Sequence, residues 1–546
     1  MTPGARGATL TVAPRGTEVQ GYLPSPPDDA EKQWYMGRQH RWLLVVQALS
    51  FTMIAYSLVA FATSRVWTSI LLVPVVLYAL TQVVSLSSSL RGKRTSRSDH
   101  AARVAAYRPD AHPSVDVFLP SAGEPVELIA NTFRHVAALQ WPGRLTVVVL
   151  DDSDRSHVAA LAQAHGFRYE VRPDRGHLKK AGNLGHGYRV TDGDLIAVFD
   201  ADFVPRPDYL HELVPYFEEP SVGIVQSPQF FDTHTSLGWL QRCAGATQEL
   251  FYRWIQPARD RSNAAICVGT CAVYRRAALE RSGGFAQIGH SEDVHTGVNL
   301  LRVGFHVRYV PILVSKGVCP DSLSGFLNQQ YRWCTGSMSL LMDRSFHREP
   351  HITFRQRLCF WSGFLYYVST GVNATFALVP AIAMVLLFPS MVHPVNSVWL
   401  LGSLVLWLVL LPVVFRSRWR LEVLRVQLLY SFAHAVAIFH VVRGRTREWV
   451  PTGAAGRGAA PLASQILRLA KVWITVSQLL LWTGLIHGAL THGLGEWWAV
   501  LTLNLVTAYV QLPVLWQRTS PPVPVDRAHL PRPRRPEART IDLRAS

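Results

Sequence analysis

Two groups of long apolar segments enclose the middle of this 546-residue chain and limit what it can fold into. Each is long enough for a helix to cross ~30 Å of hydrocarbon. Two precede the middle region and four follow it: Trp42–Thr63, Trp67–Ser88, Phe364–Phe388, Val398–Phe415, Val472–Leu490 and Trp497–Leu515. The region between the second and the third has no such segment. The sequence therefore predicts six α-helical membrane spans and one large soluble domain inserted between them.

The charge beside these segments predicts their orientation. The chain has 54 Lys and Arg against 37 Asp and Glu, a net charge of +17, and its arginine clusters lie next to spans or in the tails. Nucleic acid could attract such charge, but the positive-inside rule explains its placement better, so we expect no nucleic-acid partner. Loops 389–396 and 491–496 contain no Lys or Arg. We therefore expect a multi-pass protein of the cell (plasma) membrane with the soluble domain and both termini in the cytoplasm.

The expected organisation has eight parts. They are a disordered tail (1–40), a transmembrane hairpin (41–90), a basic linker (91–112), the soluble domain (113–345), an interfacial helix with two spans (346–416), a cytoplasmic interfacial helix with a loop (417–470), two spans (471–516) and a disordered tail (517–546). Leu421–Val442 is apolar enough to be a seventh span. Because charged and polar residues such as Glu422 and Arg425 interrupt it, a helix lying in the membrane interface fits better.

The soluble domain alternates short apolar runs with helical patterns. The runs are Val115–Leu119, Leu145–Leu150, Phe167–Val171, Leu195–Phe199 and Val222–Val225. Strands that are apolar on both faces and joined by helices indicate an α/β domain with a mostly parallel central sheet. Ligands bind beyond the carboxyl ends of such strands, where Asp151, Asp152 and Asp200 lie.

Several side chains near these ends suit phosphate and sugar chemistry. Asp200 and Asp202 follow an apolar run at a spacing that can hold Mg²⁺ or Mn²⁺, although Asp202 could instead be a helix N-cap. Lys180 could bind a diphosphate. Glu292 and Asp293 begin a helical pattern, where acids ordinarily stabilise the helix dipole, but one of them could act as a general base.

The motif Gln329-Gln330-Tyr331-Arg332-Trp333 follows these acids in the chain. Arg332 could bind phosphate charge, and Trp333 offers a flat face on which a sugar ring could stack. Trp is also a common anchor at a membrane surface, so this motif alone leaves both interpretations open.

Taken together, the pairs and motifs resemble the processive family 2 glycosyltransferases typified by bacterial cellulose synthase. DD at 151–152, DxD at 200–202, ED at 292–293 and QxxRW at 329–333 occur in the family's order between membrane spans, and the resemblance covers about residues 40–515. It implies an α/β GT-A glycosyltransferase domain, a UDP-sugar donor, Mg²⁺ or Mn²⁺ as cofactor, and a channel through the lipid bilayer for the growing polysaccharide.

The resemblance also implies roles for individual residues. Asp293 would be the catalytic base with Glu292 beside it, and Asp200 and Asp202 would hold the metal. The remaining residues would bind the nucleotide (Asp151, Asp152, Glu124, Lys180, Arg332 and Thr452) or the acceptor (Trp333, Gln329 and Thr270). Thr452 belongs to a loop at 448–453 that matches the family's gating loop only loosely, because the family's Lys is missing. His290-Ser291 and Val268-Gly269-Thr270 also depart from the family pattern near the acceptor.

The expected function is a UDP-glucose-dependent synthase of a β-glucan, most simply β-1,4-linked, that exports its product. Another β-linked polymer (β-1,3, mixed-linkage or GlcNAc-containing), sugar transfer to a lipid carrier, and a transporter or receptor with a nucleotide-binding domain remain alternatives. Accessory secretion subunits are possible partners. Since only residues 517–546 follow the last span, we expect no cyclic-di-GMP-binding PilZ domain in this chain.

Overall fold

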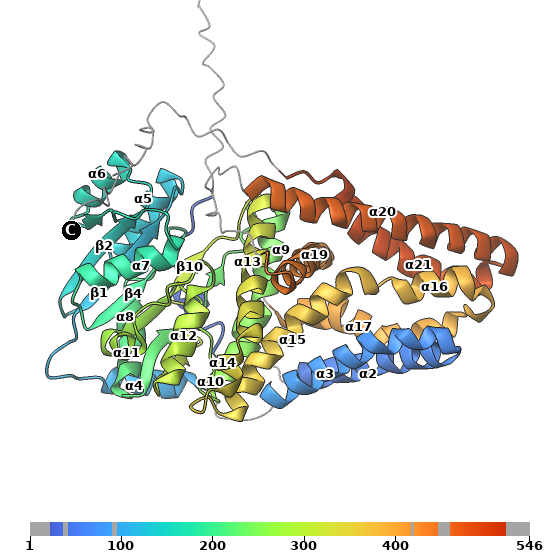
Figure 1. Ribbon diagram of the computed structural model, residues 1–546, viewed down its shortest axis with the longest axis horizontal. Helices are drawn as coiled ribbons and strands as arrows, with labels where there is room; N and C mark the ends of the chain where they lie inside the picture. Colours follow the sequence, from blue (N-terminus) through green and yellow to red (C-terminus); the bar gives the residue numbers. More distant parts are fainter. Residues whose placement is uncertain (1–21, 37–41, 90–94, 416–419, 446–458, 520–546) are drawn as a thin grey trace, which may run out of the picture.

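The computed structural model describes residues 22–36, 42–89, 95–415, 420–445 and 459–519. A soluble domain, at the left of Figure 1, adjoins a bundle of long helices at the right. Thr452 and the rest of the predicted loop 448–453 lie outside the described residues, as do residues 1–21 and 520–546 of the predicted tails.

A seven-stranded sheet forms the centre of the soluble domain, in the order β3-β2-β1-β4-β8-β6-β9. Its strands are β1 (Val115–Ser121), β2 (Leu145–Asp151), β3 (Arg168–Glu170), β4 (Leu195–Val198), β6 (Val222–Gln226), β8 (Ala272–Arg275) and β9 (His306–Tyr309). Neighbouring strands pair in parallel, except that β8 runs antiparallel to both β4 and β6. The mostly parallel sheet predicted from the apolar runs is therefore confirmed.

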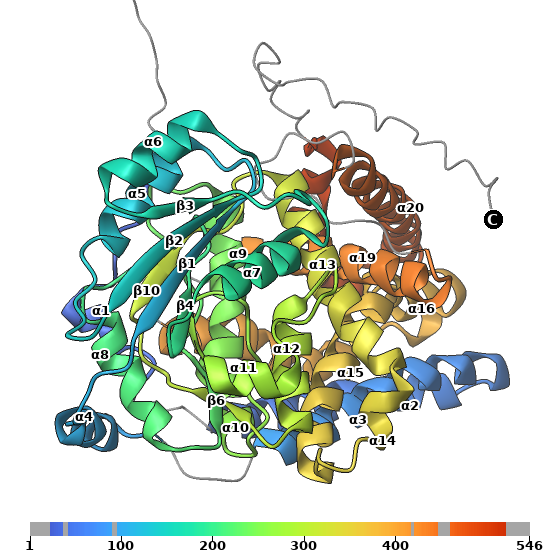
Figure 2. The same cartoon turned by 60° about the vertical axis from the view of Figure 1, so that its left-hand side comes forward.

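Helices cover both faces of the sheet, which explains why its strands are apolar on both sides. Alternate residues of β1 point to opposite faces. Val117 and Leu119 pack with one set of helices and Phe118 packs with the other. The first set is α5 (Val126–Val136), α6 (Ser156–Ala164) and α8 (Tyr209–Leu213) with η2 (Val214–Glu218); the second is α7 (Lys179–Val190), α11 (Arg276–Ser282) and α12 (Glu292–Arg302). Figure 2 shows α5 and α6 on the far side of the sheet from α7, α11 and α12.

The N-terminal segment 22–36 packs on the soluble domain beside a second, three-stranded sheet. This sheet consists of β5 (Phe203–Pro205), β10 (Ser315–Gly317) and β7 (Phe230–Phe231). Within the segment, Tyr35 and Met36 are buried, and Lys32 of α1 (Asp29–Lys32) lies 2.6 Å from Asp208 Oδ2 and 2.5 Å from Glu212 Oε1. The sequence predicts a disordered tail over residues 1–40, but residues 22–36 are ordered. These ion pairs and buried side chains hold them in place.

Seven helices in the described part of the chain are long and apolar enough to cross a membrane. Six of these segments correspond to the predicted spans: Trp42–Thr63, Thr68–Ser88, Phe354–Leu387, Pro394–Val414, Pro461–His492 and Leu494–Trp516. They contain α2 (Trp42–Thr63), α3 (Leu72–Ser89), α15 (Phe354–Phe376), α16 (Val379–Leu387), α17 (Leu401–Val405), α18 (Leu411–Val414), α20 (Ala459–His492) and α21 (Leu494–Gln511). The seventh segment is α19 (Glu422–Val442).

Helix α19 differs from the other six candidates in burial and direction. Of its most apolar window, 67% is buried inside the protein, against 39% or less for the others. Figure 1 shows α19 nearly end-on, whereas α20 and α21 run along the plane of the picture. Its direction across the bundle is consistent with the predicted interfacial helix, which stays a prediction.

A layer of helices joins the soluble domain to the bundle. One cluster of buried side chains includes residues of α9 (Trp239–Leu250), α13 (Leu323–Met342), α15, α19 and α20. Leu327 of α13, Leu429 of α19 and Ile466 of α20 are each fully buried in it. The two regions therefore share one hydrophobic core. Three further helices are α4 (Arg97–Ala106), α10 (Gln256–Asp260) and α14 (Arg344–Arg348).

Candidate active site

Strand direction brings four loops together at one edge of the main sheet. Because β1, β2 and β4 are parallel, the residues that follow them meet at this edge. Strand β8 runs the opposite way, so its first residues arrive at the same edge. The Cys271 N–H donates to the Val198 carbonyl across 3.0 Å. The sequence did not reveal this last approach, because an isolated four-residue strand carries no sign of its direction.

Lys180 connects two of these loops with the start of α12. Its ammonium lies 2.5 Å from Asp200 Oδ1, donates to the Gly269 carbonyl at 2.8 Å, and lies 4.0 Å from Glu292 Oε1. Burial lowers the pKa of Lys180, but the fields of Asp200 and Glu292 outweigh this and raise the pKa above its usual value. The predicted diphosphate ligand is therefore a cation at all ordinary pH values, placed between the predicted metal and catalytic acids.

Thr270 forms a hydrogen bond with the backbone of Asp200. It is fully buried, and its Oγ1 accepts a hydrogen bond of 2.9 Å from the Asp200 N–H. This contact orients the acid at the end of β4. Because Thr270 is buried, its predicted effect on acceptor binding would be indirect, through the position of the loop that contains it.

Asp293 lies at the start of α12, against the Gly269 loop. Its Oδ1 accepts a 2.8 Å hydrogen bond from the Val294 N–H. A Cβ on Gly269 would lie 3.0 Å from Asp293 Oδ2, and Gly269 has a φ of +77°. Burial, followed by the charge of Glu292, raises the pKa of Asp293 to about 7. Asp293 is thus able to take up a proton near neutral pH, as a general base must.

The turn before α12 depends on a glycine in α13. Ser291 has a φ of 51°, and a Cβ on Gly336 would lie only 1.8 Å from its Oγ. We expect Gly336→Ala to displace Ser291, and Asp293 with it, and to lower the turnover number about tenfold, because small displacements of a catalytic group are costly. Gly297→Ala is the matched control, since its nearest neighbour would be at an ordinary 3.5 Å. Equal turnover by the two variants would contradict this role for Gly336.

Asp200 and Asp202 form the most negative part of the site. Burial, then the charges of Asp200 and Glu124, raise the pKa of Asp202 to about 7. Glu124 is itself held by Ser121 Oγ at 2.9 Å and by the Ala122 N–H at 2.7 Å. In the described residues no group of three or more His, Cys, Asp or Glu is arranged to hold a metal ion. Two carboxylates do fit a cation that takes its other ligands from phosphate oxygens and water.

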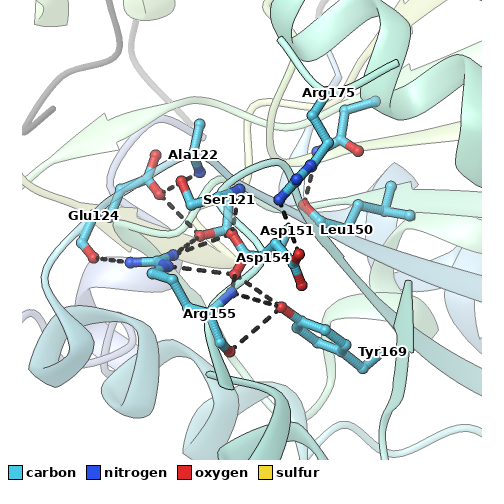
Figure 3. Close-up of polar contacts among 11 residues, drawn as sticks. Ser121, Ala122, Glu124, Leu150, Asp151, Asp154, Arg155, Tyr169 and Arg175 are labelled. Carbon is cyan, nitrogen blue, oxygen red and sulfur yellow. Dashed lines mark hydrogen bonds and ion pairs between the residues drawn. The ribbon is translucent and has the colours of Figure 1, made fainter. Parts of the chain in front are cut away.

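The two acids at the end of β2 have different surroundings. Asp151 is fully buried and accepts hydrogen bonds from the Ser153 and Arg155 N–H groups, both at 3.1 Å, from Tyr169 Oη at 3.1 Å and from the Arg155 guanidinium (Figure 3). Arg155 also donates to Ser121 Oγ and to the Glu124 carbonyl. Asp151 therefore holds the loops at the end of β2 together and is absent from the cavity wall, whereas Asp152 lines the cavity.

One cavity of about 1350 Å³ connects these residues with the helix bundle. Its wall includes Asp152, Lys180, Asp200, Asp202, Glu292 and Asp293 from the soluble domain, and Gln329, Arg332 and Trp333 from α13. It continues past Tyr366 of α15, Tyr430 of α19, and Trp407, which lies between α17 and α18. Burial lowers the pKa of Arg332, although Glu292 and Asp200 act against it. Ten of the thirteen predicted site residues thus line one space that reaches from the sheet edge into the bundle. Asp151 and Thr270 are not on its wall, and Thr452 lies outside the described residues.

Comparison with known families identifies this arrangement. The sequence model described as "Glycosyltransferase like family 2" matches residues 112–336, the stretch that contains the sheet and the acidic residues. Residues 112–336 are a family 2 glycosyltransferase domain. Together with the mostly parallel sheet, this match confirms the α/β GT-A domain that the sequence predicted.

The glycosyltransferase domain is similar to curated cellulose synthase subunits. The "Cellulose synthase catalytic subunit [UDP-forming]" of Pseudomonas fluorescens is 34% identical over 264 residues, which are 47% of this chain and 36% of that protein. The "Cellulose synthase 1 catalytic subunit [UDP-forming]" of Komagataeibacter xylinus is 31% identical over 262 residues, 46% of this chain and 35% of that protein. The matches span about a third of the length of these relatives.

Solved structures resemble the glycosyltransferase domain more distantly. A mannosyltransferase from Pyrobaculum calidifontis, in complex with GDP-Man and Mn²⁺, has 18% identity and a TM-score of 0.47, covering 67% of this chain and 97% of its own. A glucosyl-3-phosphoglycerate synthase from Mycobacterium tuberculosis has 18% identity and a TM-score of 0.28, covering 42% of this chain and 76% of its own.

Two arginines of the glycosyltransferase domain were not singled out from the sequence. Arg155, four residues after Asp151, joins the loops around that acid. Arg172 is fully buried and binds Asp152 through two hydrogen bonds of 2.6 Å, from Nε to Oδ1 and from Nη2 to Oδ2. A charged residue directly after the apolar run of β3 was the available signal for Arg172.

Replacing Arg172 is expected to destabilise the glycosyltransferase domain. In Arg172→Leu the Asp152 carboxylate, whose side chain is only 8% exposed, would lose its partner, which should cost about 3–5 kcal/mol in the free energy of unfolding. Thermal unfolding of the full chain in detergent measures this loss. Arg175→Ala removes a half-exposed pair with Asp154 and should cost at most about 1 kcal/mol. Similar unfolding midpoints for the two variants would mean that the Arg172–Asp152 pair adds no unusual stability.

Proposed function

We propose that this chain is a membrane-embedded, processive, inverting glycosyltransferase that polymerises glucose from UDP-glucose into a β-1,4-glucan and moves the product across the membrane. The observation that carries the proposal is the single cavity that joins Asp200, Asp202 and Asp293 to side chains of the apolar helices. The curated relatives, whose names describe UDP-forming cellulose synthesis, support the choice of donor and product.

The proposed donor site combines cations and hydrogen-bonding groups around the predicted metal ligands. Lys180 and Arg332 would bind the diphosphate, with Asp152 and Glu124 on the nucleotide side. Asp200 and Asp202 would hold Mg²⁺ or Mn²⁺, which when bound supplies positive charge to the departing diphosphate. Burial is the main cause of the raised pKa of Asp202, and the charges of Asp200 and Glu124 add to it. These two charges support the assignment, because a negative field favours a bound cation.

The proposed transfer is a single displacement. The terminal sugar of the acceptor would stack on Trp333, near Gln329. Its hydroxyl attacks the anomeric carbon of the donor. Asp293 accepts the hydroxyl proton as the new glycosidic bond forms, and the bond to the UDP oxygen breaks. Attack from the side opposite the leaving group inverts the anomeric carbon and gives a β-linked product from an α-linked donor.

The pKa of Asp293 predicts how the rate depends on pH. A general base works only when deprotonated, so kcat/KM should fall about tenfold per pH unit below about 7 and level off above it. UDP release measured between pH 5.5 and 8.5 gives this profile, with UDP affinity measured across the same range as the control. A rate that is flat between pH 5.5 and 7 would count against Asp293 as the base.

The sugar and linkage of the product distinguish the proposed function from its alternatives. Membranes containing the chain would be incubated with UDP-glucose and Mg²⁺, and the polymer would be digested with linkage-specific glucanases. We expect a polymer that a β-1,4-glucanase degrades. Sensitivity only to a β-1,3- or mixed-linkage glucanase, or synthesis only from UDP-GlcNAc, would select another β-linked polymer. Label found only in lipid would select non-processive transfer to a lipid carrier.

The proposed topology places the glycosyltransferase domain and both termini in the cytoplasm, where UDP-sugars are made. The arginine-rich cytoplasmic flanks predicted from the sequence support it. In this orientation the donor end of the cavity, at Asp200 and Asp202, faces the supply of UDP-sugar, and the opposite end leads into the helix bundle.

A further inference from the structure

A buried arginine lies on the cavity wall beyond the acidic site. Arg259 belongs to α10, directly after the π-helical turn Phe251–Ile255, a rare geometry that is frequent at functional sites. Its side chain is 3% exposed and lines the cavity. Nη2 donates to Ser362 Oγ at 3.3 Å, whereas Nε and Nη1 have no hydrogen-bond partner within the described ranges of the chain.

Helix α15 is shaped to receive this guanidinium. A Cβ on Gly363 would lie 2.7 Å from Arg259 Nη2, so only a glycine leaves room for it there. Ser362, the residue before, accepts the hydrogen bond that Arg259 Nη2 donates. Both residues also line the cavity. The position of Arg259 is therefore built by two elements that are distant in sequence.

No carboxylate among the residues that the structure describes forms an ion pair with Arg259. The neighbouring acid, Asp260, is already engaged: its carboxylate accepts from Arg308 Nη1 at 3.1 Å and from the Tyr309 N–H at 2.7 Å. A buried charge without a counter-charge is costly for a folded protein. An anionic occupant of the cavity would accept hydrogen bonds from Arg259 Nε and Nη1.

The chemistry of the wall restricts that occupant. A guanidinium offers only donors, and its planar fork binds carboxylate and phosphate groups with paired hydrogen bonds. Trp254 and Tyr367 also line the cavity and offer flat faces suited to sugar rings. The occupant that satisfies both features is a saccharide that carries an anionic oxygen group.

We propose that Arg259 forms an oxyanion subsite for the acceptor chain and binds a carboxylate or phosphate group that this chain carries. The inference rests on the proposed function, because that function places a saccharide in the cavity, and it adds to the proposed glucan an acidic group that UDP-glucose does not supply. A carboxylate would come from an acidic sugar unit, and a phosphate from a substituent or from the start of the chain.

Binding of three matched oligosaccharides tests this subsite. Radiolabelled cellotriose, cellotriose oxidised to a carboxylate at C6, and cellotriose 6-phosphate would each be equilibrated with the full chain in detergent. Because hydrogen bonds to charged groups are strong, one of the anionic ligands should bind at least about tenfold tighter than cellotriose. Which of the two binds tighter identifies the group. Equal affinity for all three ligands would overturn the proposal.

Variants of the wall show whether Arg259 causes the preference. Arg259→Gln should bind the three ligands within about twofold of one another, and Arg259→Lys should keep part of the preference. Gly363→Ala keeps the charge but crowds the guanidinium, so it should also weaken anionic binding. It carries the test if Arg259→Gln fails to fold, as judged by size-exclusion chromatography. An unchanged preference in a folded Arg259→Gln protein would refute the assignment.

Release of UDP from UDP-glucose, measured on the same preparations, separates this inference from the proposed function. Arg259-dependent binding of anionic ligands without any UDP release would reject the proposed function and keep the subsite. UDP release and polymer synthesis without any preference for anionic ligands would keep the function and reject the subsite.

Discussion

Asp293→Asn is expected to lower the rate of UDP release about 10²–10⁴-fold, the usual contribution of a general base. The amide has almost the same shape as the carboxylate, so it can still accept the hydrogen bond from the Val294 N–H, but it cannot take up the acceptor proton. Because Asp293 is not a predicted nucleotide ligand, the affinity for UDP should change little. The loss should therefore appear in kcat.

The assay for this variant would follow UDP release from UDP-glucose by the detergent-solubilised chain, with UDP affinity measured by calorimetry. Asp192→Asn is a matched control, because Asp192 is 80% exposed and pairs only with Arg144 on the surface among the described contacts. It should retain wild-type rates. If Asp293→Asn kept more than about a tenth of the wild-type rate, another group would have to be the base.

Asp202→Asn should separate nucleotide binding from its dependence on a cation. In the wild-type chain, adding Mg²⁺ or Mn²⁺ should tighten UDP binding, because Asp200 and Asp202 would hold a cation whose charge attracts the diphosphate. The variant has one carboxylate left, so the cation should no longer strengthen UDP binding. Since a metal contributes several kcal/mol to the stabilisation of a phosphate leaving group, turnover should fall about 10²–10³-fold.

Calorimetry with and without each cation measures the first effect, and UDP release measures the second. A chelator added to the wild-type chain should reproduce the variant, and Asp192→Asn should respond to cations as the wild type does. A cation that tightens UDP binding equally in Asp202→Asn would show that Asp202 is not a ligand. In that case the ion pair with Lys180 would be the role left for Asp200 at the end of β4.

Much of the fold could be predicted because local patterns determine it. Helix α2 has the predicted bounds, Trp42–Thr63, since length and hydrophobicity alone define such a segment. The predicted strands of the soluble domain agree with the structure to within two residues at each end, because burial on both faces gives continuous apolar runs. Asp152 and Asp200 line the same cavity as expected, because both follow parallel strands of one sheet.

Other features depend on contacts between distant residues and had no local signal. Residues 22–36 are polar and rich in proline, yet Lys32 finds two acids near residue 210. The adjacent acids Asp151 and Asp152 look equivalent in sequence, but the guanidinium groups of Arg155 and Arg172 take one each. The apolar pattern of α19 shows that it is buried and leaves open whether lipid or protein buries it.

The attachment of residues 22–36 has a mechanical consequence. This segment precedes α2, so the soluble domain is connected to the helices at its N-terminal side as well as through the shared core around α13. If the chain extrudes a polymer, as proposed, each added unit would push back on the soluble domain. The ion pairs of Lys32 with Asp208 and Glu212 would then resist rotation of that domain against the helices.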